Sequence, residues 1–116
     1  MSAIQRFYIR INDLSKADSE DSDFAFQGSS AEAFAEALQH ALRDSDLFAR
    51  WRDTQEDPDA IPESLSPHDP AATVHAEIAD LHTDVEVVTT LPHQVVAHRL
   101  TLLVGHHWTL RDVRPA

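Results

Sequence analysis

Hydrophobic and polar residues alternate in three stretches of this chain, residues 4–12, 72–80 and 85–90. A period of two is typical of strands that bury one face and expose the other. The short segment "LHTD" separates the second stretch from the third, so we expect these two to form an antiparallel hairpin. The pattern turns the following residues toward a core: Phe7, Ile9, Ile11, Val74, Ala76, Ile78, Val85 and Val87.

A helical period is present in residues 29–42, "SSAEAFAEALQHAL". Phe34 and Leu38 are four residues apart and therefore fall on one helical face. Ser29 and Glu32 have the S-x-x-E spacing of a capping box, which predicts that the helix begins here. The alanines between these positions favour the helix further.

A second, shorter helix is expected over residues 45–55, "SDLFARWRDTQ", with Asp44 as a candidate cap. Leu47, Phe48 and Trp51 lie on one side of this helix. The two helices together form a helical pair between the first and second of the alternating stretches.

The segment 93–104 decides the fold, because its apolar residues fit either a strand or a helix. Its boundaries favour a helix. Pro92 stands where the first turn of a helix tolerates proline, and Gly105 stands where a helix ends in a residue with positive φ. A strand of this length would also be uncommon. After Gly105, "HWTLRDV" predicts a final strand, with Trp108 and Leu110 turned to the core.

The expected order is strand, helix pair, strand, strand, helix, strand. This is the βαββαβ order of a ferredoxin-like sandwich, an α+β fold with helices on one face of an antiparallel sheet. If residues 93–104 were a strand, the chain would instead form an antiparallel β meander with one helical pair. Residues 24–28 are a candidate for a short further strand. We expect a core of Phe7, Ile9, Phe34, Leu38, Trp51, Val74, Ile78, Val85, Val87, Leu100, Leu103, Trp108 and Leu110.

Two acidic segments interrupt the regular pattern. Residues 13–23, "DLSKADSEDSD", contain almost no apolar side chain, and residues 53–70 contain four prolines, which oppose helix and strand alike. We expect both segments to be flexible, solvated loops. The 116 residues have the length of one domain, and we expect 1–116 to form a single one.

Nine basic and twenty acidic residues give a net charge of −11, which opposes binding to nucleic acid or to an anionic bilayer. No apolar run approaches the ~20 residues that span a membrane, and the beginning of the chain lacks the apolar region of a signal peptide. The chain has no cysteine, which excludes disulfides and thiolate metal sites. We therefore expect a cytoplasmic protein that binds neither nucleic acid nor membrane.

Eight histidines are many for this length, and imidazole is a common metal ligand. Their spacing does not favour a metal site, because no two lie at the H-x-x-x-H separation that brings ligands together on a helix. The adjacent pair His106 and His107 falls in the turn before the last strand, where a polar turn is the expected role. The best local ligand pair is His75 and Glu77, which share a strand face. We expect no metal and no other cofactor, with these four residues as the alternative ligands.

The chain carries no nucleophile elbow, P-loop or dinucleotide-binding glycine motif, and its two glycines leave little scope for a loop that cradles phosphate. We therefore expect no enzyme and assign no catalytic residue.

The sheet face away from the helices would carry Tyr8, Arg10, His75, Glu77, Glu86, Val88, Thr109, Arg111 and Val113. Its single aromatic residue and its acids argue against the base stacking of RNA-binding sheets. We expect Arg10 and Arg111 to form cross-strand ion pairs with Glu77 and Glu86. The apolar area left on this face would suit self-association into a homodimer.

These observations favour a small, acidic, non-catalytic binding protein: an adaptor, inhibitor or immunity-type partner for a basic protein surface. A small-molecule or metal-binding domain that uses histidines of the sheet face and the turn is the alternative. The candidate binding residues are Asp18, Glu20, Asp21, Asp23, Tyr8, Arg10 and Arg111.

Overall fold

The computed structural model describes residues 4–12, 30–79, 82–105 and 107–116. The strands are β1 (Gln5–Ile11), β2 (Thr73–Ala79), β3 (His82–Thr89) and β4 (Trp108–Pro115). The helices are α1 (Ala31–Arg43), α2 (Asp46–Asp53) and α3 (His93–Val104). The strands form one antiparallel sheet in the order β2-β3-β1-β4. The prediction of an α+β protein with an antiparallel sheet is confirmed.

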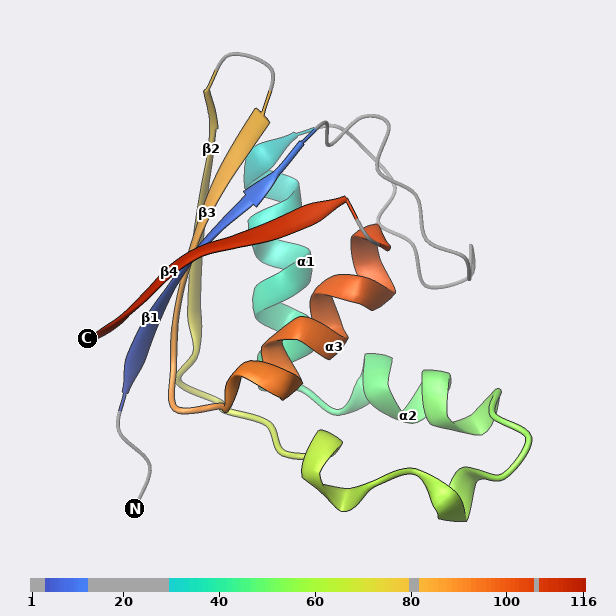
Figure 1. Cartoon of the computed structure of the whole chain (residues 1–116). Helices are drawn as coiled ribbons and strands as arrows, with labels where there is room; N and C mark the ends of the chain where they lie inside the picture. The colour runs from blue at the N-terminus through green and yellow to red at the C-terminus, as the bar shows by residue number, and fades with distance from the viewer. Residues whose placement is uncertain (1–3, 13–29, 80–81, 106) are drawn as a thin grey trace.

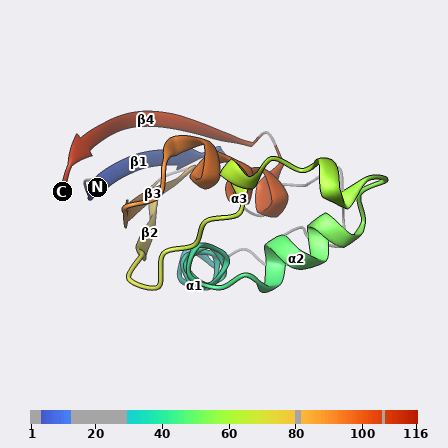
Figure 2. The ribbon, with the colours of Figure 1, turned by 90° about the horizontal axis from the view of Figure 1, so that it is seen from below.

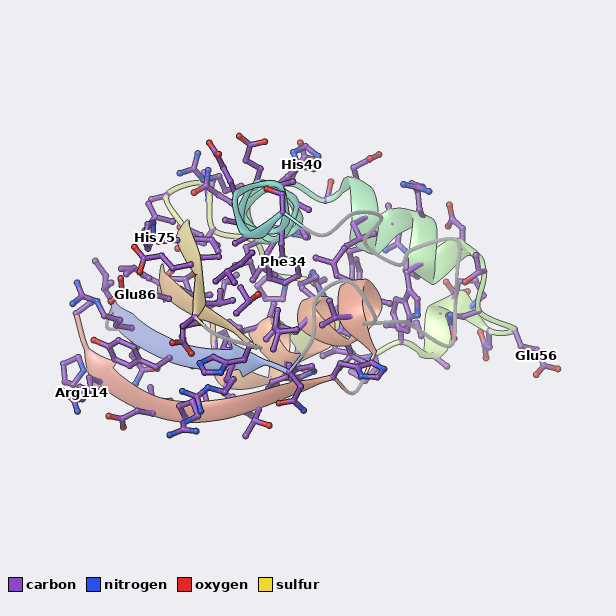
Figure 3. The ribbon with its side chains drawn as sticks, turned by 90° about the horizontal axis from the view of Figure 1, so that it is seen from above. Phe34, His40, Glu56, His75, Glu86 and Arg114 are labelled. Atoms are coloured by element: carbon purple, nitrogen blue, oxygen red, sulfur yellow. The ribbon has the colours of Figure 1, made fainter. Side chains whose placement is uncertain are left out.

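Helices α1 and α3 cover one face of the sheet, while the opposite face is open (Figures 1 and 2). Helix α2 lies to one side, away from the sheet. Phe34 points from α1 toward the sheet, whereas His40 and Glu56 point outward (Figure 3). Phe34 and Leu38 are fully buried with Ile9 in one hydrophobic core. The period-two and helical patterns therefore identified the two faces that meet in this core.

Helix α1 begins one residue later than the capping-box spacing predicted. Ser30 is the N-cap, and its hydroxyl accepts a hydrogen bond from the Ala33 amide at 3.2 Å. The expected box of Ser29 and Glu32 is therefore wrong, because Glu32 lies two positions after the actual cap and not three. Asp44 was the candidate cap of α2, but the N-cap is Ser45, whose side chain makes no capping hydrogen bond. The Asp44 carboxylate accepts a hydrogen bond from the Asp46 amide at 3.1 Å.

The helix predicted over 93–104 is confirmed as α3, which excludes the β meander. Gly105 ends the helix with φ 62° and ψ −129°, so the predicted positive φ is also confirmed. Its amide donates to the Thr101 carbonyl at 2.9 Å, which closes the last turn of the helix. The chain then turns and enters β4 at Trp108.

Two residues do not lie where the alternation placed them. Ile78 was expected in the core, but its exposed fraction is 61%. Ile78 lies near the end of β2, which is an edge strand of the sheet, and alternation along a strand does not reveal that position. Val113 was expected on the open face, but it packs against the core. The register of β4 against β1 shifts between Tyr8 and Ile9, which brings Val113 opposite Phe7. Trp51, Val74, Trp108 and Leu110 are half-buried.

The proline-rich segment is more regular than expected, since it contains the 3₁₀ turns Pro58–Ala60 and Glu63–Leu65. It ends at a buried carboxylate, Asp69, which accepts hydrogen bonds from the Thr89 hydroxyl at 2.8 Å and the Thr90 amide at 3.1 Å. Asp69 thus ties the start of β2 to the end of β3. The acidic loop 13–23 and the candidate strand 24–28 lie outside the described residues.

Candidate functional site

Two rows of polar side chains cross the open face of the sheet. Antiparallel pairing places His75, Glu86 and Tyr8 in one row and Glu77, Asp84 and Arg10 in the next. We use the term open face for Arg6, Tyr8, Arg10, His75, Glu77, Asp84, Glu86, Val88, Thr109 and Arg111.

Ion pairs join the basic and acidic residues of this open face. Arg10 Nε lies 3.3 Å from Asp84 Oδ1, and Arg6 Nε lies 3.3 Å from Glu86 Oε1. The expected cross-strand pairing is therefore present, but with other partners. The register puts Asp84 opposite Arg10, and it puts Glu86 opposite Tyr8 and next to Arg6. The acids of this face are largely neutralised by their neighbours on the sheet.

A shallow hollow of about 340 Å³ lies in the middle of the open face. The three open-face residues proposed as binding residues, Tyr8, Arg10 and Arg111, all line it. The apolar area expected here is smaller than predicted, because Val113 turns inward and the Arg114 guanidinium lies 5.7 Å from the Tyr8 ring centre. The structure therefore brings these three residues together in a polar, ion-paired setting.

The histidine candidates lie far apart. His75 Nε2 and Glu77 Oε1 are 3.1 Å apart on β2, and both side chains are well exposed. His107 precedes β4, at the opposite edge of the sheet from β2, and His106 lies outside the described residues. Within the described ranges, no group of three or more histidine or acidic side chains has the arrangement of a metal site.

The remaining acidic side chains differ from those of the sheet. Glu32 and Glu36 are exposed on α1, and the exposed residues Glu56, Asp57, Asp59 and Glu63 lie between α2 and the second 3₁₀ turn. The ion pairs that join described residues to one another do not include any of these six. The predicted binding residues Asp18, Glu20, Asp21 and Asp23 lie outside the described residues. Negative charge on the described surface is therefore least compensated on α1 and on residues 54–63.

A buried arginine, Arg99, joins α3 to the second 3₁₀ turn and to α2. Its side chain is fully buried, and it donates hydrogen bonds to the Leu65 carbonyl at 2.8 Å and to His98 Nδ1 at 2.6 Å. Its guanidinium lies 4.6 Å from the centre of the Phe48 ring of α2. Among the described residues, no carboxylate pairs with it. Arg99 therefore positions the second 3₁₀ turn through the Leu65 carbonyl and α2 through the Phe48 ring.

Two histidines share this cluster with Arg99. The His98 ring packs edge-on to the Trp51 ring at 4.3 Å between centres, and the His68 ring packs edge-on to Phe48 at 6.1 Å. Burial, and then the charge of Arg99, lower the pKa of His98 to about 4. The same two causes, in the same order, hold the pKa of His68 below its ordinary value, against opposing effects of Ser66 and Asp44. Both imidazoles are therefore neutral at neutral pH.

Sequence reasoning missed this cluster, although α3 contained a signal for it. Arg99 is four residues after Val95 and four before Leu103, so the helical period places it on the buried face. An arginine at such a position is uncommon and points to a dedicated hydrogen-bond partner.

No helix in the described part of the chain combines the length and the apolar character that crossing a membrane requires. Comparison with known protein families, with curated proteins and with solved structures gives no match.

Proposed function

We propose that this protein is a non-catalytic binding domain whose acidic surface receives a basic segment of a partner protein. One observation carries the proposal. On the open face Asp84 pairs with Arg10 and Glu86 with Arg6, whereas no described cation forms an ion pair with the exposed acids of α1 or of residues 54–63. In a chain of net charge −11, this leaves an uncompensated negative potential on the helical side. Complementary charge would steer a basic partner toward it.

The experiment is a binding titration with a lysine-rich peptide at low and at high salt. We expect the affinity to fall as salt rises, because exposed charges are screened. Neutralising Glu32 and Glu36 together should weaken binding. Neutralising Asp84 and Glu86 together, whose carboxylates pair with Arg10 and Arg6, should have little effect. Binding that is absent, or that does not depend on salt, would contradict the proposal.

The acids of 18–23 extend this proposal to the loop outside the described residues. If the loop steers the partner, neutralising Asp18, Glu20, Asp21 and Asp23 slows association more than it speeds dissociation. An unchanged association rate would remove this loop from the binding surface.

The hollow on the open face supports a second candidate, a small ligand that carries both charges. Arg10 and Arg111 could pair with an anionic group of such a ligand, and Glu77 with a cationic one, with Tyr8 as the apolar contact. Intact-mass measurement of the natively purified protein tests this candidate through a retained ligand, and the absence of any added mass after native purification counts against it.

Homodimerisation through the open face stays a prediction, and sedimentation measurements of the oligomeric state would test it.

We also propose that the fold is a ferredoxin-like sandwich enlarged by α2 and the 3₁₀ turns. Its support is the strand order β2-β3-β1-β4, with helical connections after β1 and after β3. A cytoplasmic location is proposed as well, and the lack of cysteine is compatible with it.

A further inference from the structure

Strand β2 is an edge strand, since it pairs with β3 on one side and no described strand lies on the other. An exposed strand edge offers a row of backbone donors and acceptors to another chain. Edge strands are often protected by proline, by a bulge or by lysine. The seven residues of β2, "TVHAEIA", include no proline and no lysine, and their pairing with β3 is regular.

One hydrogen bond shows which amides point away from the sheet. The Val74 amide donates to the Gln39 side-chain oxygen of α1 at 3.1 Å, so it cannot also bond to β3. Because backbone direction alternates along a strand, the amides of Ala76 and Ile78 also point to the outer edge. The Gln39 carboxamide thus occupies the place that a carbonyl of an added strand would take.

A groove of about 360 Å³ runs between this edge and α1. Its strand wall includes Val74 and Ala76, and its helix wall includes Glu32, Glu36 and Gln39. The groove therefore combines the outward-facing backbone of an edge strand on one side with two exposed carboxylates on the other. A strand lying in it would turn every second side chain toward α1.

We propose that an extended basic segment of a partner protein adds to β2 as a fifth strand, with its basic side chains paired with Glu32 and Glu36. This inference rests on the proposed function and names its binding mode. Backbone hydrogen bonds to the edge supply affinity, and the two carboxylates select lysine or arginine at alternate positions. The partner's carbonyl displaces Gln39 from the Val74 amide.

The test uses a peptide of alternating lysine and valine with the length of β2. Binding should slow hydrogen exchange at the Ala76 and Ile78 amides, because both become donors to the added strand. A peptide with N-methyl groups on alternate backbone amides has the same charge. It lacks the N–H groups that would donate to the outward-pointing carbonyls of β2. It should bind about fivefold more weakly or worse, as expected for the loss of one or more net hydrogen bonds.

Variants of the protein supply the matched comparison. Ala76→Pro removes the outward amide without touching the ladder to β3, and proline is tolerated in edge strands. It should weaken peptide binding about fivefold, whereas Ala76→Ser, which keeps the amide, should not. Gln39→Ala releases the Val74 amide and should tighten binding, which provides a readout if Ala76→Pro fails to fold.

The outcomes separate this inference from the proposed function. Salt-dependent binding without protection of Ala76 and Ile78, and with equal affinity for the N-methylated peptide, overturns strand addition but leaves the acidic binding surface intact. Absence of any peptide binding overturns both. Protection of these amides that grows with protein concentration in the absence of peptide would assign the edge to a second copy of the chain, and would also overturn the proposal.

Discussion

Arg99 donates a hydrogen bond to its neighbour His98, with 2.6 Å between Nη1 and Nδ1. Because a guanidinium can donate but not accept, Nδ1 of His98 must be unprotonated. The neutral imidazole therefore carries its proton on Nε2. Arg99 is buried and His98 is half-buried beside it, and of the two only the arginine is charged at neutral pH. This arrangement makes the cluster sensitive to acid.

Acid should destabilise the protein through His98. The pKa of His98 is about 4 in the folded protein, against 6.5 for an ordinary histidine. Between these values the unfolded chain binds a proton that the folded chain does not, so the free energy of unfolding falls as the pH drops from 6.5 toward 4. The full shift sets an upper limit of about 3 kcal/mol, which solvent screening of the partly buried ring reduces.

Urea denaturation at neutral and at mildly acidic pH measures this loss. His98→Gln keeps an acceptor for Arg99 but cannot titrate, so its acid-induced loss should be smaller than that of the wild type. His40→Gln, at an exposed position of α1, should leave the loss unchanged. Equal acid sensitivity of wild type and His98→Gln would show that His98 does not control it.

Replacing the buried charge should raise the pKa of His98. Arg99→Met removes both the Coulombic effect and the hydrogen bond while it fills similar space, so burial alone remains to lower the pKa. The carbon-bound imidazole protons, followed by NMR through a pH titration, report this directly. The stability of Arg99→Met should differ from wild type by about 1 kcal/mol or less, because buried charges replaced by apolar groups of similar volume often cost little.

Arg99→Ala is the contrasting variant. It leaves a void beside Phe48 and removes the donor to the Leu65 carbonyl, so a loss of about 2–4 kcal/mol is expected. If Arg99→Met were as unstable as Arg99→Ala, the hydrogen bonds of the guanidinium would be the dominant contribution, and packing a minor one.

The ionised carboxylate of Asp69 should stabilise the contact between the start of β2 and the end of β3. Burial opposes its ionisation, but hydrogen bonds from Thr89, Thr90 and Ala71 outweigh burial and hold the pKa of Asp69 below its ordinary value. Its contribution is therefore present at neutral pH and is lost as the pH falls through this lowered value. Asp69→Asn should cost about 1–3 kcal/mol in urea denaturation at neutral pH. A double-mutant cycle with Thr89→Val should show coupling, and additive losses would contradict a shared hydrogen bond.

Local signals were sufficient for the elements and for most of the core. Helix α3 could be predicted because Pro92 and Gly105 mark its ends through backbone restrictions that depend on no distant contact. Ile78 and Val113 were misplaced for a different reason. The exposure of Ile78 depends on its place near the end of an edge strand, and the burial of Val113 depends on a register shift against β1. Local alternation encodes neither.

The candidate sites also combine features that local sequence encodes with features that depend on distant contacts. Alternation along the strands predicted that ion pairs would form on the open face, but the partners depend on the register between strands. The register places Arg10 opposite Asp84, and not opposite the expected Glu77 or Glu86. The groove beside β2 could not be predicted, because Glu32 and Val74 are far apart in sequence and meet only through the docking of α1.

Chelator treatment should leave the thermal midpoint unchanged. A metal bound only to the folded protein adds stability that chelation removes, and the exposed pair His75 and Glu77 has no third described ligand beside it. A lower midpoint that zinc or nickel restores would contradict this prediction. The candidate ligands would then be His75, Glu77, His106 and His107, and alanine variants of each would identify the site.

Gly105 should tolerate no side chain of ordinary chirality. Its φ of 62° and ψ of −129° lie in a region that glycine reaches readily and that a Cβ atom disfavours, and the residue is buried. Gly105→Ala should cost about 1–3 kcal/mol in urea denaturation, and Gly105→Val more, because a β-branched residue is the least suited to positive φ. The mirror image of this backbone conformation is ordinary extended structure. A semisynthetic protein with D-alanine at this position should therefore be more stable than Gly105→Ala. If the two alanine proteins were equally unstable, the loss would come from crowding by the methyl group at a buried turn, and the positive φ would not be its cause.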